Sequence, residues 1–249
     1  MRNQSHHRLS HRLRITVLQF SWLVGALTLA GCHSAGTNQN VQGVEQFQQG
    51  QPQAAIQNFE KALSDNPSNP DSFYNLGAAY HYMGKQKQDP RMLQESEALY
   101  NRCLDLDPNH VACHRALAVL LVDTNRPQSA FTLLERWSAR NPQMADARIE
   151  MARLSEEFGE TERAKQYLTD AIDVDPTNAR AWSALARLRE QDGQLAQALN
   201  NYQQAYHLNN YQPGVAQRMA SVQQQISTGA VTPPGGTRTV QNQQGWTTR

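Results

Sequence analysis

The amino-acid sequence repeats itself with a period of 34 residues. A stop made of Asn or Asp followed by Pro recurs with spacings of 41, 34 and 34 residues, at Asn66-Pro67, Asp107-Pro108, Asn141-Pro142 and Asp175-Pro176. Three series of mostly small residues keep the same step, each with a single spacing of 41: Ala55, Ser96, Ala130, Ala164 and Ala198; Ala62, Cys103, Trp137, Ala171 and Ala205; and Gly43, Gly77, Ala118, Ala152 and Ala186. A fixed period of this length is typical of a repeat architecture. We therefore expect five repeats, the second of which carries seven extra residues.

Each repeat carries the pattern of two helices. Large apolar residues step by three and four positions, which places an apolar stripe along each helix, and small residues at fixed places let neighbouring helices approach closely. The recurring Pro ends the second helix because it lacks an N–H group. Asn69, Asn109 and Asn178 follow as candidate N-caps of the next repeat, and Pro70 suits the first helical position. One helix pair cannot bury its stripe alone, so we expect the repeats to stack into a solenoid.

The repeat resembles the tetratricopeptide repeat (TPR), a helix-turn-helix unit. Phe73 to Tyr80 reproduce that family's aromatic, Leu-Gly and Tyr positions in the first helix, and Trp182, Leu185 and Ala186 do so again. The resemblance covers about Gly36 to Gln212. It implies an all-α protein, a right-handed α-solenoid of about five TPR helix-turn-helix repeats with a C-terminal capping helix.

The ends of the repeat region and its insertion can be placed on the sequence. We expect residues 40–227 to form the solenoid, including a capping helix over Pro213 to Ser227 whose Arg218 lies outside its apolar stripe. The seven extra residues fall among Lys85 to Met92, and we expect them to lengthen the inter-helix loop or the second helix. Residues 228–249 are rich in Thr, Gln, Pro and Gly, which predicts a disordered tail.

The amino-terminal segment has the charge order of a secretory leader. Residues 1–14 carry four Arg and no acidic residue, and a predominantly apolar run follows over residues 15–30. The run is shorter than the roughly 20 residues that a membrane-spanning helix needs. We expect residues 1–31 to be a signal peptide, with a permanent transmembrane helix as the weaker alternative.

The junction Leu-Ala-Gly-Cys, ending at Cys32, resembles the bacterial lipobox. The resemblance implies cleavage before Cys32 and acylation of that residue, for example with palmitate, so that residues 32–39 form a lipidated N-terminus and short tether. Two or three acyl chains anchor a protein stably. The alternative is an ordinary secretory leader with a chance cysteine. His33 replaces the Asp that often marks inner-membrane retention, so we expect a lipid-anchored protein in the bacterial cell envelope, at the outer membrane facing the periplasm.

Charge and motifs exclude several function classes. Lys plus Arg number 23 and Asp plus Glu 22; without the four leader Arg the balance becomes 19 minus 22, or −3. This balance excludes a nucleic-acid binder held by a basic surface. The sequence has no Gly-rich phosphate loop, no Gly-x-Ser-x-Gly elbow and no pair of acid-base carboxylates at a readable spacing. We therefore expect no enzyme activity and no cofactor.

Cysteine and histidine residues gather at the junction between the second and third repeats. His110, Cys113 and His114, with Asp107 nearby, are possible metal ligands, which keeps a metal- or electron-handling envelope protein as an alternative of a different class. Against a metal site, Cys113 falls at a packed position of the repeat and His110 at a turn, so we expect none. Cys103 and Cys113 fall at places that touch in stacked repeats. They are either a disulfide or two small buried thiols.

The TPR resemblance also implies a concave groove lined by fixed positions of each first helix. Carried onto this sequence, the partner-binding positions are Tyr74, His81, Tyr82, Arg115, Val119, Ile149, Arg153, Arg180 and Arg187. The four arginines suit bidentate bonds to the carboxylates of an extended peptide or a protein tail. The alternative is that they are ordinary solvated residues among neighbouring acids.

The functional expectation follows from the leader, the repeats and the excluded chemistry. We expect a membrane-anchored TPR lipoprotein that acts as a non-enzymatic scaffold or adaptor, binding envelope proteins or peptide segments in its groove. The sequence is similar to bacterial TPR lipoproteins that assemble pilus secretins and to those that act as adaptors for murein hydrolases. The alternative within this class is a pilotin-like assembly factor for a secretin or type IV pilus.

Overall fold

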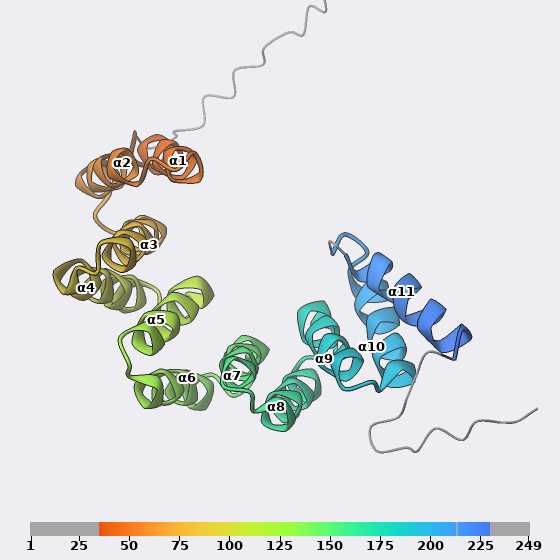
Figure 1. Cartoon of the computed structure of the whole chain (residues 1–249). Coiled ribbons are helices and arrows are strands. Elements are labelled where there is room, and N and C mark those ends of the chain that lie inside the picture. The colour runs from red at the N-terminus through yellow and green to blue at the C-terminus, as the bar shows by residue number, and fades with distance from the viewer. Residues whose placement is uncertain (1–34, 213, 230–249) are drawn as a thin grey trace, which may run out of the picture. The chain divides into compact units, whose positions relative to one another are not determined.

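The computed structural model describes residues 35–212 and 214–229 (Figure 1). Within these ranges the chain forms eleven helices and no strand: α1 (Ala35–Gln48), α2 (Pro52–Asp65), α3 (Pro70–Lys87), α4 (Pro90–Leu106), α5 (Val111–Asp123), α6 (Pro127–Arg140), α7 (Ala145–Glu157), α8 (Thr161–Val174), α9 (Ala179–Gln191), α10 (Leu195–Leu208) and α11 (Val215–Ser227). The predicted signal peptide, Cys32 and all but two residues of the predicted tail lie outside the described residues. Among the residues that are described, no helix is both long and apolar enough to cross a membrane.

The helices pair in chain order into five hairpins. Each helix packs against the next one, from α1 and α2 through to α10 and α11. The first helix of each hairpin also contacts the first helix of the following hairpin, in the pairs α1 with α3, α3 with α5, α5 with α7 and α7 with α9. This arrangement confirms the predicted α-solenoid of five repeats, and it brings the first helices side by side along one face of the stack (Figure 1).

Small residues mark the contacts between helices, as the periodicity predicts. Ala55, Ala130 and Ala164 are all fully buried. At Gly77 of α3, an added Cβ would lie 2.8 Å from Cε1 of the buried Tyr100 on α4. Because packed interiors tolerate extra atoms poorly, these positions hold the helices at their close spacing.

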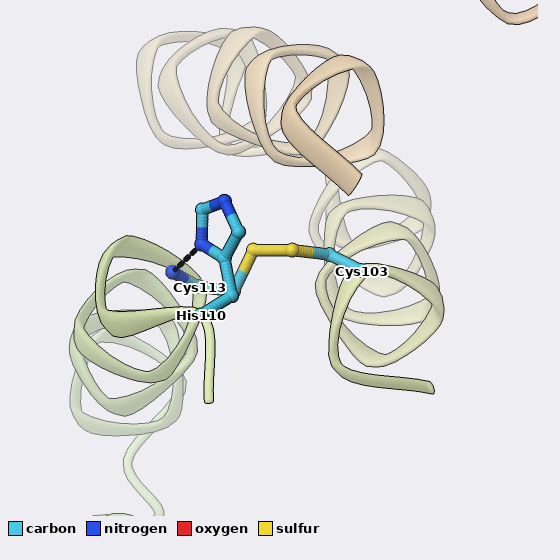
Figure 2. A group of neighbouring side chains, drawn as sticks. All are labelled: Cys103, His110 and Cys113. Carbon is cyan, nitrogen blue, oxygen red and sulfur yellow. Dashed lines mark hydrogen bonds between the residues drawn. A yellow bond between two sulfur atoms is a disulfide. The ribbon is translucent and has the colours of Figure 1, made fainter. Parts of the chain in front are cut away.

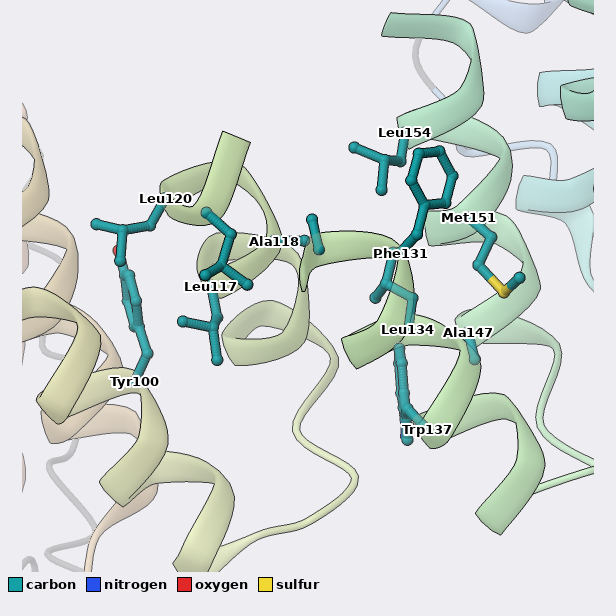
Figure 3. Packing of buried hydrophobic residues seen from close by; sticks show 12 residues of the cluster. Tyr100, Leu117, Ala118, Leu120, Phe131, Leu134, Trp137, Ala147, Met151 and Leu154 are labelled. Carbon is teal, nitrogen blue, oxygen red and sulfur yellow. The ribbon is translucent and has the colours of Figure 1, made fainter. Parts of the chain in front are cut away.

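The buried residues of the middle repeats form a continuous cluster from α4 to α7. Figure 3 shows Leu117 and Leu120 of α5 beside Tyr100, and Leu134 and Trp137 of α6 facing α7. Trp137 takes the place where the other repeats have a small residue. Its indole ring is 2% exposed and stacks on the ring of His114, with centroids 4.0 Å apart. In the third repeat, the stacked rings of His114 and Trp137 therefore form part of the contact between α5 and α6.

Two of the three predicted N-caps are present and one is wrong. The side chain of Asn69 accepts a hydrogen bond from the backbone N–H of Asp71, and Asn178 caps α9 in a similar way. At α5 the cap is His110 in place of Asn109: its Nδ1 accepts from the backbone N–H of Cys113 at 3.1 Å. The Asn109 side chain instead accepts from the Trp137 indole N–H at 3.2 Å. Trp137 therefore binds the Asn109 side chain, which the sequence pattern assigned to the N-cap of α5.

The seven extra residues of the second repeat lie in helices: of the two predicted alternatives the longer loop is wrong and the longer second helix is confirmed, and the first helix is longer as well. Helices α3 and α4 have 18 and 17 residues, against 13 or 14 in the hairpins that follow. No proline interrupts α3 before its end, and Asp89 caps α4 by accepting from the backbone N–H of Arg91. Gly84 allows Leu93 to pack closely against α3 in the added turn. Both helices therefore grow while staying in contact.

The solenoid also begins earlier than residue 40. Helix α1 begins at Ala35, inside the segment assigned to a tether. The Asn38 side chain accepts from the Gln42 side chain one turn later, at 3.3 Å, and Asn40 accepts from Asn75 of α3 at 3.1 Å. These polar contacts stabilise a turn that carries few apolar residues, which is why the apolar pattern misses it.

Candidate functional site

A pocket of about 680 Å³ opens among the first helices of the last three repeats and the capping helix. Its wall carries five arginines, from α5, α7, α9 and α11, and two glutamates, both from α7: Arg115, Arg153, Arg180, Arg187 and Arg218, with Glu150 and Glu156. We call this set the arginine pocket. Cationic side chains thus outnumber anionic ones on its surface.

Glu150 lies at the centre of the arginine pocket and is completely buried. Arg115 donates to both of its carboxylate oxygens, the Nε bond to Oε2 being 2.8 Å long. Nε of Arg153 donates to the same Oε2 at 3.2 Å, and Nη2 of Arg180 donates to Oε1 at 3.2 Å. One carboxylate therefore orients arginines from three successive first helices.

The electrostatics of this cluster favour an ionised Glu150. Burial raises the pKa of its carboxyl group, but the hydrogen bonds and charge of Arg115, with the charges of Arg153 and Arg180, lower the pKa below its ordinary value. The pKa of Arg115 is raised by its bonds to the same carboxylate. Three arginines thus share the Glu150 carboxylate, and two of them also pair with other acids, Arg180 with Asp146 at 2.9 Å and Arg153 with Glu157 at 3.3 Å.

Two further ion pairs hold the remaining arginines. Arg187 donates from both Nη atoms to Glu156, the Nη2 to Oε2 bond being 2.6 Å long. Arg218 of the capping helix donates to Glu190 of α9 at 3.1 Å, which joins α11 to the wall. As the sequence pattern predicts, Arg218 lies outside the apolar stripe of α11, and its side chain is 55% exposed; the pattern does not show that it reaches Glu190, which is 12% exposed.

The arginine side chains of the pocket are more exposed to solvent than the buried Glu150 that binds three of them. The Glu150 side chain is 1% exposed, whereas the five arginine side chains of the pocket are 34–55% exposed. Nη2 of Arg153 is buried and has no hydrogen-bond partner among the described residues. A guanidinium group has five N–H donors. The carboxylates accept from only some of these donors, and all five arginines line the pocket.

The predicted groove residues divide into two sets. Arg115, Ile149, Arg153, Arg180 and Arg187 all line the arginine pocket. Among them, Ile149 is 7% exposed and packs into the hydrophobic core, so it supports the wall more than it offers a contact.

The other predicted groove residues lie on α3 and α5, away from the arginine pocket. His81 hydrogen-bonds through Nε2 to Asp123 at 2.9 Å and is largely buried, and burial lowers its pKa more than Asp123 raises it. Tyr74 packs beside the ring of Tyr100, and Val119 is half-buried. Tyr82 is 47% exposed and meets the edge of Phe47. This half offers one exposed aromatic ring and few free polar groups.

Sequence reasoning missed Glu150, although a signal for it exists. The positions one period before and after it are Ala116 and Ala184. A glutamate between two alanines on neighbouring first helices has room to be buried, and the arginines at the adjacent positions supply its partners.

The cysteines form a second cluster, at the junction of α4 and α5. Cys103 and Cys113 are joined by a disulfide with a Cα–Cα distance of 6.6 Å, and the His110 ring lies beside it (Figure 2). The predicted grouping of His114 and Asp107 with these residues is not assembled. His114 donates from Nε2 to the Pro108 carbonyl at 3.0 Å and stacks on Trp137, while Asp107 accepts from the backbone N–H of Asn109. The potential ligands that lie together are Cys103, His110 and Cys113.

Comparison with known families identifies the repeat. The family model described as "TPR repeat" matches residues 43–84, and the model described as "Tetratricopeptide repeat" matches residues 122–188. This chain carries tetratricopeptide repeats. A solved TPR protein from Thermus thermophilus is 23% identical, covers 76% of this chain and all of its own, and superimposes with a TM-score of 0.55. This likeness shows the same fold.

Curated relatives match over shorter stretches. The peroxisomal targeting signal receptor of Saccharomyces cerevisiae is 31% identical over 80 residues, which is 32% of this TPR protein and 12% of the receptor. Cellulose synthase operon protein C of Pseudomonas fluorescens is 28% identical over 141 residues, or 53% of this chain and 10% of that protein. This TPR protein therefore spans about a tenth of the length of either relative.

Proposed function

We propose that this TPR protein is a non-enzymatic scaffold whose arginine pocket binds an extended, acidic segment of a partner protein. The observation that carries the proposal is the arrangement around Glu150: a buried carboxylate holds three arginines, and all three are partly exposed and line an open pocket. Arginine matches carboxylates with paired, planar N–H donors. Because the arginines are already oriented, a ligand binds them without ordering long side chains first.

The shape and position of the pocket favour an extended peptide over a compact ligand. Its arginines come from α5, α7, α9 and α11, so a chain lying across these helices meets at least one cation from each. The exposed arginine faces repel a basic segment. The curated yeast relative is named as a receptor for a targeting signal, which agrees with recognition of a protein segment by such repeats.

We also propose that the scaffold works at a membrane surface in the bacterial envelope. The support is the leader over residues 1–31 and the lipobox-like junction at Cys32. Acyl chains on this residue would hold the solenoid close to the lipid. Labelling cells with radioactive palmitate tests the anchor: the wild type incorporates label and the Cys32→Ser variant does not. Equal labelling of both refutes it.

The pocket is tested by fluorescence polarisation with three labelled ten-residue peptides in which glycine alternates with Glu, Gln or Lys. We expect the Glu peptide to bind, and the others to bind at least about 10-fold more weakly, which corresponds to about 1.4 kcal/mol. The double variant Arg187→Ala with Arg218→Ala should lose a similar factor for the Glu peptide.

The matched control is Arg163→Ala on α8. Arg163 is also an exposed, paired arginine, bonded to Glu160 and Tyr167, but it does not line the pocket. Its removal should leave binding unchanged. Equal affinity for the Glu and Gln peptides, or the same loss in both variants, contradicts the proposal. In-cell crosslinking of wild type and the double variant, each shown to be folded by circular dichroism, then identifies the partner.

A further inference from the structure

We propose that the thiol form of this chain binds a Zn²⁺-class metal ion through Cys103, His110 and Cys113. The site lies where the end of α4 meets the start of α5, apart from the arginine pocket, and it is independent of the peptide-binding function. In the disulfide form the two sulfur atoms are bonded to each other and are not available to a metal. Metal binding and the disulfide are therefore alternative states of the same residues.

The donor atoms are already gathered. One ligand atom from each of the three residues lies within 4.8 Å of the others, both cysteines are fully buried, and the His110 side chain is 13% exposed. A tetrahedral zinc ion with Zn–S bonds of about 2.3 Å needs sulfur atoms about 3.8 Å apart. Thiols relaxing from a bonded pair reach that separation by side-chain rotation, while α4 and α5 keep their packing.

His110 has the tautomer that a metal requires. Its Nδ1 accepts a hydrogen bond from the backbone N–H of Cys113, so Nδ1 carries a lone pair and Nε2 carries the proton. That Nε2–H points to a carboxylate oxygen of Asp71 on α3, at 3.0 Å. A histidine whose second nitrogen donates to a carboxylate is the arrangement that orients zinc ligands. Figure 2 shows the ring standing beside the two sulfur atoms.

Cys113 lies in the first turn of α5, as its third residue. Metal binding at Nδ1 of His110 would replace the hydrogen bond that this nitrogen accepts from the backbone N–H of Cys113. The three residues supply three ligands, and water completes the tetrahedral coordination as the fourth.

Oxidation converts the metal form into the disulfide form. Two thiolates lose two electrons in total to the disulfide of an oxidant, their sulfur atoms join, and the oxidant's disulfide becomes two thiols after taking up two protons. The metal ion loses two of its three protein ligands in this step. It therefore leaves as the disulfide forms.

The test uses the full-length chain with Cys32→Ser, so that Cys103 and Cys113 are its two thiols. The reduced protein is titrated with Co²⁺ without oxygen, and sulfur-to-cobalt charge-transfer absorption reports thiolate ligation. We expect one equivalent of cobalt to bind and to be displaced by Zn²⁺. The oxidised protein should show no such absorption, and adding a disulfide oxidant to the zinc-loaded protein should release one equivalent of zinc.

The key variant is His110→Asn, because asparagine is a good N-cap and keeps α5 folded while removing the imidazole. It should weaken cobalt binding by more than about 100-fold, and Asp71→Asn by about 10- to 100-fold. His207→Gln, an exposed histidine on α10, is the control and should change nothing. Circular dichroism establishes that each variant is folded. The proposal is overturned if reduced wild type shows no cobalt–thiolate absorption, if His110→Asn binds as wild type does, or if the oxidised chain binds equally well.

Discussion

Replacing Glu150 by Gln tests whether one buried carboxylate organises the groove. The substitution keeps the side-chain volume and removes the charge that three arginines share. Removing one partner of a buried ion pair costs about 3–5 kcal/mol. Here the arginines are 34–47% exposed and turn toward water once the charge is gone. We therefore expect a smaller loss, about 2–3 kcal/mol in the free energy of unfolding at pH 7.

The loss depends on pH in a direction that the pKa of Glu150 sets. Burial raises this pKa, but the arginines lower it by more, so the folded value lies below the unfolded one. Such a group stabilises the fold at pH values above its unfolded pKa, and the contribution disappears as pH falls through the folded pKa. The stability difference between wild type and Glu150→Gln is therefore complete above about pH 5.5. It shrinks in acid, because wild-type Glu150 also becomes neutral.

Urea unfolding followed by circular dichroism, at pH 7 and at steps down to the acid limit of the folded state, measures this difference. The control is Glu157→Gln, whose side chain is 44% exposed and contacts Arg153 at 3.3 Å. An exposed pair of this kind is worth about 1 kcal/mol or less. A loss below 1 kcal/mol for Glu150→Gln, the same loss in both variants, or a loss that persists in acid would refute the reasoning.

Three further predictions concern the stack itself. Gly77→Ala forces the new methyl group against Tyr100 and should lower the free energy of unfolding by about 1–3 kcal/mol; an unchanged thermal midpoint contradicts the close contact. Trp137→Ala empties a fully packed aromatic site and should cost about 3–5 kcal/mol in urea unfolding. Losing the link between Cys103 and Cys113, with metal absent, should cost about 2–3 kcal/mol, seen as a lower thermal midpoint of the reduced protein.

The repeat frame could be predicted from sequence because it rests on local rules that recur. Small residues at a period of 34, proline stops and capping asparagines each appear several times, so one exception does not hide the pattern. The exception among the predicted N-caps arises where a side chain has two possible hydrogen-bond partners. Trp137 takes the Asn109 side chain, and His110 replaces it as the cap of α5. No rule for single helices contains that choice.

The candidate site was less predictable, because it depends on ion pairs between residues of different repeats. Family positions identified four pocket arginines, but not that Glu150 already holds three of them. An acid on a helix usually faces water, and only the alanines one period away indicate that this one can be buried. Arg218 was missed for a different reason: a terminal helix was treated as a cap, although its side chain completes the wall.

The arginine pocket is complete only while the terminal helix α11 is docked on the stack. Helix α11 packs on α10 at the end of the stack, and its Arg218 reaches Glu190 across to α9. Terminal elements open more readily than central ones. Because the fifth arginine reaches the pocket only while α11 is docked, undocking of this helix weakens the binding of an acidic segment. A bound acidic segment in turn keeps α11 closed, and occupancy of the pocket can be followed as slower amide exchange in the last helix.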